Sequence, residues 1–128
     1  MANELILIVE DDDKNRKLVR ELLQFKGYRT LDAVTGEDGV ALAATHRPDL
    51  ILMDYQLPGI DGIEAFRRIR DAAATAHIPI VAVTASAMPG QARRMKEAGF
   101  DGFQSKPINV KEFIQVVSDM FSGKANQP

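Results

Sequence analysis

Acidic, hydroxyl and basic side chains follow separate apolar runs of the chain, and together their types suit the handling of phosphate. The set consists of three consecutive carboxylates, a fourth carboxylate, a hydroxyl and an amine: Glu10, Asp11, Asp12, Asp54, Thr84 and Lys106. If the runs are parallel strands, their carboxyl ends share the edge of the sheet where open α/β sheets bind ligands. Carboxylates beside a hydroxyl and an ammonium suit a divalent cation and a phosphoryl group. The sequence therefore predicts a phosphate-handling site at that edge.

Asp54 stands at the end of an apolar run, directly before a loop. Its position alone leaves three roles open: a nucleophile, a metal ligand, or an ordinary carboxylate at a strand end. A carboxylate can attack phosphorus and form an acyl phosphate, and the developing charge then needs a hard cation and fixed donors. The other acidic residues of the set therefore shift the balance towards the two chemical roles.

The acidic run predicts a Mg²⁺ (or Mn²⁺) site, because neighbouring carboxylates repel one another unless a cation lies among them. The expected ligands are two direct carboxylates, one carboxylate acting through a water molecule and one backbone carbonyl: Asp11 and Asp54, Glu10 or Asp12, and Gln56. The alternative role for Asp12 or Asp13 is to cap the helix that follows. For Asp13 the cap is the favoured interpretation.

Thr84 and Lys106 both have an ordinary interpretation, the first as a β-branched strand residue and the second as a solvated lysine. However, small side chains at 85–87 leave room for a phosphoryl group against the Thr84 hydroxyl. Beside a carboxylate cluster, Lys106 becomes an ion-pair partner and a phosphate ligand. Pro107 predicts a stiff turn directly after it, with a cis Lys106–Pro107 peptide bond.

Five apolar runs alternate with segments of helical periodicity, which predicts a parallel sheet covered by helices on both faces. The expected strands are 5–9, 28–33, 50–53, 80–83 and 101–105, and the expected helices are 13–26, 36–45, one containing Ile63, Phe66 and Ile69, 88–98, and 109–121. The helix at 88–98 has a thin apolar stripe of Ala92, Met95 and Ala98. We therefore expect it to be the most weakly anchored helix.

Composition narrows the class of protein. A chain of 128 residues fits one domain, and the absence of cysteine excludes a disulfide framework, a thiolate metal site and cysteine catalysis. The net charge of −2 with mixed signs does not favour a nucleic-acid surface. There is no basic leader, and no apolar run approaches the roughly 18 residues of a membrane span. We expect a cytoplasmic monomer or weak dimer, with a domain over 1–122 and a flexible tail over 123–128.

Five motifs, in this order and with this spacing, resemble the receiver domain of two-component response regulators. They are Leu7 to Asp12 (LIVEDD), Pro48 to Asp54 (PDLILMD), Leu57 to Gly62 (LPGIDG), Ile80 to Ala85 (IVAVTA) and Ser105 to Pro107 (SKP). The resemblance covers about 4–121. Asn15, Pro79 and Met88 bring the chain closest to stand-alone, DivK-like cell-cycle regulators and to receivers attached to hybrid kinases. The resemblance implies a flavodoxin-like (βα)5 doubly wound fold with strand order 2-1-3-4-5.

The resemblance also implies a role for each site residue. Asp54 becomes the phosphoacceptor, Thr84 the switch hydroxyl, Lys106 the phosphate-binding lysine and Phe103 the switch aromatic. The competing interpretation of Phe103 is an ordinary core residue of its strand. The chain departs from the common pattern by having Glu10 before Asp11 and by having a glutamine, Gln56, two residues after the acceptor.

The implied function is that of a single-domain response regulator in a phosphorelay, with no output domain and no enzymatic activity beyond assisting its own phosphorylation and dephosphorylation. The expected partners are a histidine kinase or histidine phosphotransfer protein and a downstream kinase or effector, and neither nucleic acid nor membrane. The implied output face lies on the fourth helix, fifth strand and fifth helix and includes Met88, Ala92, Met95, Gln104 and Val110. The alternatives are an aspartate-nucleophile phosphatase or phosphotransferase, a degenerate receiver that serves as a scaffold, or a phosphorelay shuttle.

Overall fold

Five parallel strands form a single sheet in the order β2-β1-β3-β4-β5 in the computed structural model, which describes residues 3–84 and 89–122. The strands are β1 (Leu5–Val9), β2 (Arg29–Ala33), β3 (Leu50–Asp54), β4 (Ile80–Thr84) and β5 (Gly102–Ser105). The predicted strand order and doubly wound topology are therefore confirmed. Asp54 and Thr84 are the last residues of β3 and β4, so both lie at the carboxyl edge of the sheet.

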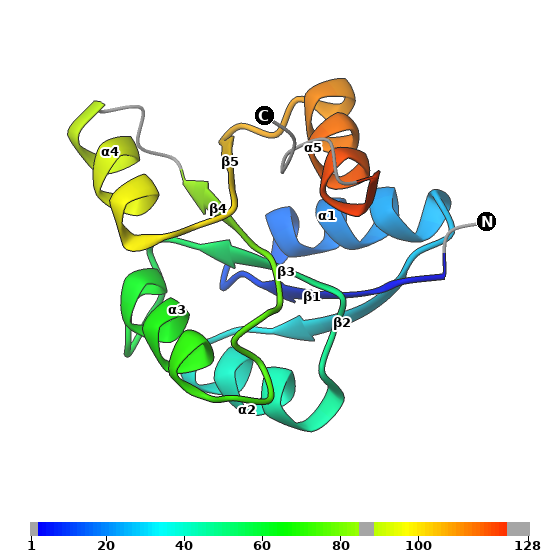
Figure 1. Cartoon of the computed structure of the whole chain (residues 1–128). Helices are drawn as coiled ribbons and strands as arrows, with labels where there is room; N and C mark the ends of the chain where they lie inside the picture. The colour runs from blue at the N-terminus through cyan, green and yellow to red at the C-terminus, as the bar shows by residue number, and fades with distance from the viewer. Residues whose placement is uncertain (1–2, 85–88, 123–128) are drawn as a thin grey trace.

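Five helices alternate with the strands and cover the sheet on both faces (Figure 1). They are α1 (Asp13–Phe25), α2 (Gly36–His46), α3 (Gly62–Asp71), α4 (Pro89–Ala98) and α5 (Val110–Ser122). Each of the first three begins after a polar side chain that accepts a hydrogen bond from the backbone N–H of its first turn. After α1, Gly27 has φ +93°, as the predicted helix stop requires. Within the described residues, no helix has the length and apolar character to cross a membrane.

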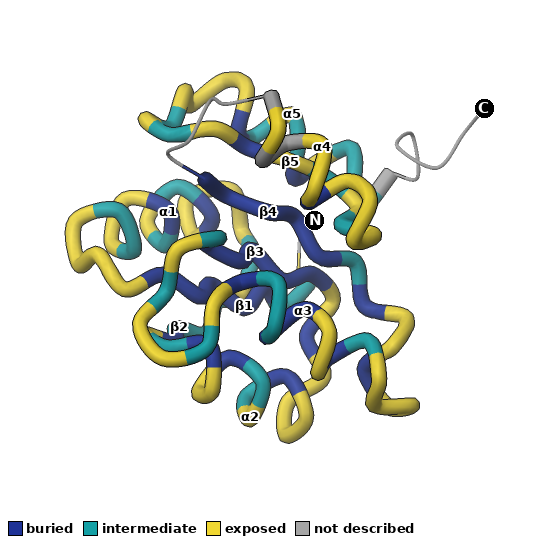
Figure 2. Tube along the Cα trace, turned by 90° about the vertical axis from the view of Figure 1, so that its left-hand side faces the viewer, coloured by how far each residue is buried: buried dark blue, intermediate teal, exposed yellow. Residues whose placement is uncertain are grey.

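Two apolar cores lie between the sheet and its helices, one on each face, and Figure 2 shows β1, β3 and β4 largely buried and much of the helices exposed. One core packs alternate strand residues such as Leu7, Ile51 and Ile80 against α2 and α3. The other packs the intervening residues, such as Ile6 and Leu52, against α1 and α5. Because β1, β3 and β4 have apolar side chains on both faces, their carboxyl ends are held rigidly.

Among the described side chains of helix α4, the apolar anchor is smaller than the sequence indicated. Met95 is fully buried, but Ala98 is exposed, so the expectation that Ala98 anchors the helix is wrong. Ala98 instead lines a surface hollow of about 260 Å³ beside α3. A second hollow, of about 300 Å³ and lined by Met95, lies on the β5 side of the helix. Among the described side chains of α4, Met95 is the buried one, and hollows lie beside the helix on its α3 and β5 sides.

Candidate functional site

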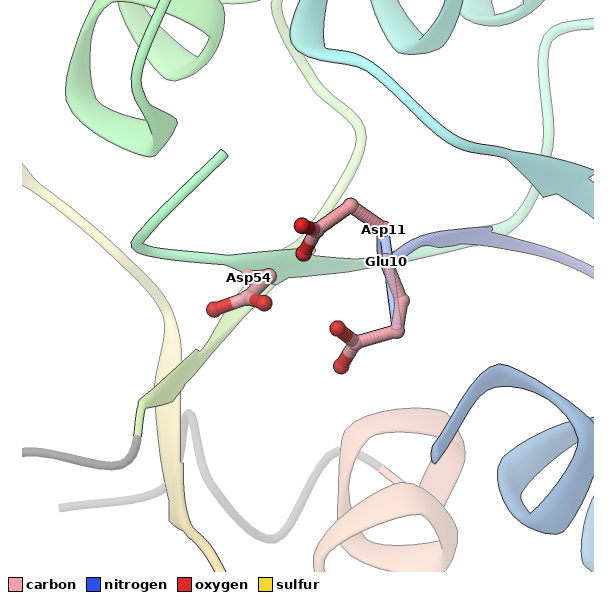
Figure 3. Close-up of side chains that lie close together, drawn as sticks. All are labelled: Glu10, Asp11 and Asp54. Atoms are coloured by element: carbon pink, nitrogen blue, oxygen red, sulfur yellow. The ribbon is translucent and has the colours of Figure 1, made fainter. Parts of the chain in front are cut away.

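Three carboxylates from two strand ends come together at the carboxyl edge of the sheet. Glu10 and Asp11 follow β1, Asp54 ends β3, and each offers an oxygen within 4.8 Å of the other two. Figure 3 shows the three side chains around a common space. Glu10 and Asp54 are each 4% exposed, whereas Asp11 is open to solvent. This acidic pocket (Glu10, Asp11 and Asp54) supplies the hard oxygen donors that a small divalent cation prefers.

Lys106 crosses from the end of β5 and closes the acidic pocket with its ammonium group. Its Nζ lies 2.8 Å from Glu10 Oε1 and 3.0 Å from Asp54 Oδ2. The Lys106 N–H donates to the Thr84 carbonyl at 2.8 Å, so the backbone is fixed beside β4. The Lys106–Pro107 bond, which the sequence predicted to be cis, is cis. Lys106 is therefore an ion-pair partner of two buried carboxylates rather than a solvated lysine.

Burial and charge change the acidity of both partners in this ion pair. Burial raises the pKa of the Glu10 carboxyl, Lys106 lowers it in part, and the nearby Asp54 charge raises it again. For Lys106, burial acts to lower the pKa, but its bonds to Glu10 and Asp54 outweigh burial and hold the pKa above its ordinary value. The lysine is therefore firmly protonated, and it relieves the repulsion between two carboxylates that lie close together.

The turn between β1 and α1 separates the roles of the consecutive acidic residues. Asp12 is the N-cap of α1, since its Oδ2 accepts the Asn15 N–H at 2.8 Å. The Asp12 N–H in turn donates to Glu10 Oε2 at 3.1 Å. Asp13 is the first helical residue and pairs with Arg16, so the interpretation of Asp13 as the cap is wrong. Of the two alternatives for the water-mediated ligand, Glu10 is the one that lies in the acidic pocket.

The loop after β3 holds the other side of Asp54. The Gln56 N–H donates to Asp54 Oδ1 at 3.1 Å, while Oδ2 bonds to Lys106. The Gly62 N–H bonds to the Tyr55 carbonyl at 3.0 Å, which folds the loop back on itself. A Cβ on Gly62 would lie 2.6 Å from the Asp54 carbonyl oxygen, so the close approach requires glycine. Both carboxylate oxygens of Asp54 are thus oriented by fixed donors.

Thr84 and Phe103 lie on neighbouring strands in different surroundings. Thr84 is fully buried and is paired with Ser105 in the β4–β5 register, next to Lys106. Phe103 is 39% exposed, so the interpretation of this residue as an ordinary core side chain is wrong. Its side chain lines the hollow of about 300 Å³ between α4 and β5. The hollow therefore leaves space beside the Phe103 ring into which the ring could turn.

The residues expected on the output face are only partly available to a partner. Met95 is fully buried and Gln104 is 1% exposed, so the expectation that these two side chains form an accessible surface is wrong. The Gln104 side chain instead turns inward and donates to the Ser105 carbonyl at 3.0 Å. Val110 is 49% exposed, as a contact residue must be. Met88 and the side chain of Ala92 lie outside the described residues.

Sequence reasoning missed Arg16. Its guanidinium donates to the Glu10 carbonyl at 3.0 Å, although the residue lies in the second turn of α1. The only sequence signal was its spacing of three from Asp13, which favours an ion pair along a helix. Nothing in the sequence indicated that the same group would reach back to the pocket.

Three comparisons place these features among known proteins. The family model of the response regulator receiver domain matches residues 6–118. The polar-differentiation response regulator DivK of Brucella anthropi is 44% identical over 112 residues, which are 88% of this chain and 91% of that protein. DivK of Brucella ovis is 43% identical over the same shares.

Solved structures show the same fold. The receiver domain of a Pseudomonas aeruginosa sensor histidine kinase, which has a magnesium ion coordinated in its active site cleft, is 32% identical with a TM-score of 0.87. The match covers 94% of this chain and 98% of that one. The chemotaxis response regulator CheY4 of Vibrio cholerae is 26% identical with a TM-score of 0.87, over 92% and 98% of the two chains.

Proposed function

Because the chain belongs to the response regulator receiver domain family, we propose that Asp54 accepts a phosphoryl group from a phosphohistidine and that the modified protein signals by changing its affinity for a partner protein. One observation carries this proposal. Asp54 is a buried carboxylate at a strand end, with a lysine on one oxygen, a backbone N–H on the other and two more carboxylates beside it. Burying a carboxylate beside two others is unfavourable, so this arrangement is typical of a site that binds a cation or a phosphoryl group.

The donor set of the acidic pocket fits Mg²⁺. Asp11 and Asp54 would bind the ion directly, and Glu10 would hold one of the water molecules that Mg²⁺ retains. The Gln56 backbone carbonyl would supply a further oxygen. The magnesium ion in the Pseudomonas receiver supports this assignment. A bound Mg²⁺ would offset the negative charge that gathers on the transferred group and on the carboxylates around it.

Residues of the chain position the transfer and stabilise its product. A carboxylate oxygen of Asp54 attacks phosphorus in line, the P–N bond to the donor imidazole breaks, and the bonding electron pair stays on the imidazole nitrogen. The product is an acyl phosphate on Asp54. The Lys106 ammonium, 3.0 Å from Asp54 Oδ2, then bonds to one phosphoryl oxygen. The Thr84 hydroxyl donates a hydrogen bond to another phosphoryl oxygen.

The proposed donor is a histidine kinase or a histidine phosphotransfer protein, since both present a phosphohistidine. Signalling then depends on a surface that differs between the two states, and α4, β5 and α5 are the proposed elements. Among the described residues of that face, Phe103 and Val110 are the large apolar side chains that are exposed. The weak anchoring of α4 supports this choice, because an element with little buried surface changes position at low cost.

The test is phosphorylation of the purified protein, followed by intact-mass spectrometry. Acetyl phosphate or an autophosphorylated histidine kinase should add one phosphoryl group in the presence of Mg²⁺, and EDTA should prevent it. Asp54→Asn should abolish the gain in mass. Asp61→Asn is the matched control, because Asp61 is an exposed cap of α3 that can be replaced by another good cap. Full modification of Asp54→Asn would contradict the assignment.

A further inference from the structure

The side chain of Arg16 braces the turn that carries Asp11. Its Nη1 donates to the Glu10 carbonyl at 3.0 Å and its Nη2 donates to Asp13 Oδ1 at 2.6 Å. Its Nε lies 3.6 Å from Asp32 Oδ2 on β2. The side chain is only 17% exposed. A planar guanidinium offers several donors at fixed angles, so one residue ties together the turn, the start of α1 and the neighbouring strand.

Asp11 depends on its backbone for its position. It lies between the end of β1 and the start of α1, and within the described residues its carboxylate accepts no hydrogen bond. Two bonds hold Glu10: its N–H, in the preceding peptide, donates to the Ala33 carbonyl at 3.0 Å, and its carbonyl, in the Glu10–Asp11 peptide, accepts from Arg16. Without Arg16, the carbonyl of the Glu10–Asp11 peptide loses this donor, and the peptide next to Asp11 is less restrained.

Arg16 is placed so that it does not occupy the acidic pocket itself. Both of its carboxylate partners, Asp13 and Asp32, lie outside that pocket, and both offset its charge. We infer that Arg16 is a positioning residue for the divalent cation. Arg16 fixes the Glu10–Asp11 peptide, and the fixed peptide directs the Asp11 carboxylate towards Asp54. This inference rests on the proposed Mg²⁺ site. Side chains that hold a metal ligand in place typically change metal affinity by about 10- to 100-fold when removed.

Charge alone predicts the opposite result, and this makes the inference testable by the sign of the effect. Removing a cation beside an acidic pocket should strengthen the binding of Mg²⁺ if Arg16 acts only through its charge. If Arg16 positions Asp11, its removal should weaken binding. Arg16→Lys separates the two effects further, because lysine retains the charge but loses the fixed fork of donors.

Arg20 provides a matched control on the same helix. It also bonds to Asp32, and in the described part of the chain it has no contact with the Glu10 peptide. Calorimetric titration of Mg²⁺ into the unphosphorylated protein is the measurement. We expect Arg16→Ala to raise the Kd about tenfold, Arg16→Lys to raise it by several fold, and Arg20→Ala to leave it within twofold of the wild type.

Each outcome of this titration decides the inference. Unchanged or tighter binding by Arg16→Ala would overturn it, and so would equal weakening by Arg20→Ala. If Arg16→Ala unfolds, which circular dichroism would show, Arg16→Lys alone carries the test, and wild-type affinity in that variant would overturn the inference. If the wild type itself does not bind Mg²⁺, the proposed metal site fails instead, so the two failures are distinguishable.

Discussion

The ammonium of Lys106 bonds to the carboxylate of Glu10 at 2.8 Å, even though the two residues come from the opposite ends of the chain. Glutamate is longer than aspartate by one methylene, which adds about 1.5 Å of reach. In this chain, where glutamate stands in place of the first of the common pair of aspartates, Glu10 and Asp54 share one lysine. We expect phosphorylation to move the Lys106 ammonium away from Glu10 and towards the phosphoryl group, because that group brings new acceptor oxygens to Asp54.

Replacing Glu10 should change how stability depends on pH. Burial raises the pKa of Glu10 above 4.5, so the folded state binds this proton more tightly than the unfolded state does. The resulting stability is fully present below pH 4.5 and is lost as the pH rises through the raised pKa. We therefore expect the free energy of unfolding of Glu10→Gln, relative to the wild type, to increase as the pH rises above 4.5 and through the raised pKa of Glu10. Urea denaturation in EDTA measures it, and a constant difference would contradict the expectation.

Removing the shared ammonium should destabilise the protein when no metal is present. Lys106→Met leaves Glu10 and Asp54, both 4% exposed, without their common cation. Leaving a buried polar group unpaired costs about 1–3 kcal/mol, and we expect a loss of unfolding free energy in that range at neutral pH. Lys111→Met is the control, since Lys111 is exposed on α5. Equal stability of the two variants in urea would show that the ion pair contributes nothing.

Asp11 and Asp13 should differ sharply in their effect on metal binding. Asp11 lies in the acidic pocket, whereas the Asp13 side chain is 87% exposed and points to Arg16. Asp11→Ala removes a direct oxygen ligand and should abolish detectable Mg²⁺ binding in calorimetry. Asp13→Ala should weaken it much less. Similar losses from both substitutions would mean that the metal has been assigned to the wrong residues.

Asp12 should matter for stability rather than for the metal. Its side chain accepts the Asn15 N–H, so Asp12→Ala removes the cap of α1 and should cost about 1 kcal/mol of unfolding free energy. Asp12→Asn keeps an accepting oxygen and should recover most of that loss. Both variants should bind Mg²⁺ with nearly wild-type affinity in the same calorimetric assay. A large loss of affinity would return Asp12 to the list of ligands.

The strands and the site residues were accessible from the sequence because they depend on local patterns, whereas the strand order was implied by the resemblance to receiver domains. Short apolar runs predict strands buried on both faces, and residues after such runs must meet at one edge. The contribution of Arg16 was not predictable, because it depends on a side chain that reaches back to a carbonyl six residues earlier. The burial of Gln104 was missed for a similar reason: alternation along a short edge strand does not reveal which polar side chain turns back to bond to its own backbone.

Phosphorylation should change the protection of α4, β5 and α5 more than that of the loop after β3. Thr84 ends a buried strand beside Lys106, and we expect its hydroxyl to move towards a phosphoryl oxygen on Asp54. The Phe103 ring, 39% exposed beside a hollow of about 300 Å³, then has room to turn inward.

Amide hydrogen exchange with and without beryllofluoride, a phosphoryl mimic, distinguishes this route from its rival. The rival is a signal that passes through residues 55–62, where Gln56 and Gly62 already bond tightly around Asp54. That loop is held by these bonds, whereas Met95 is the buried side chain among those described on α4, so we expect the helix to move at the lower cost. We expect changed protection over 89–105, and the same experiment on Thr84→Ala should show a smaller change there. Changes confined to 55–62 would assign the signal to the loop.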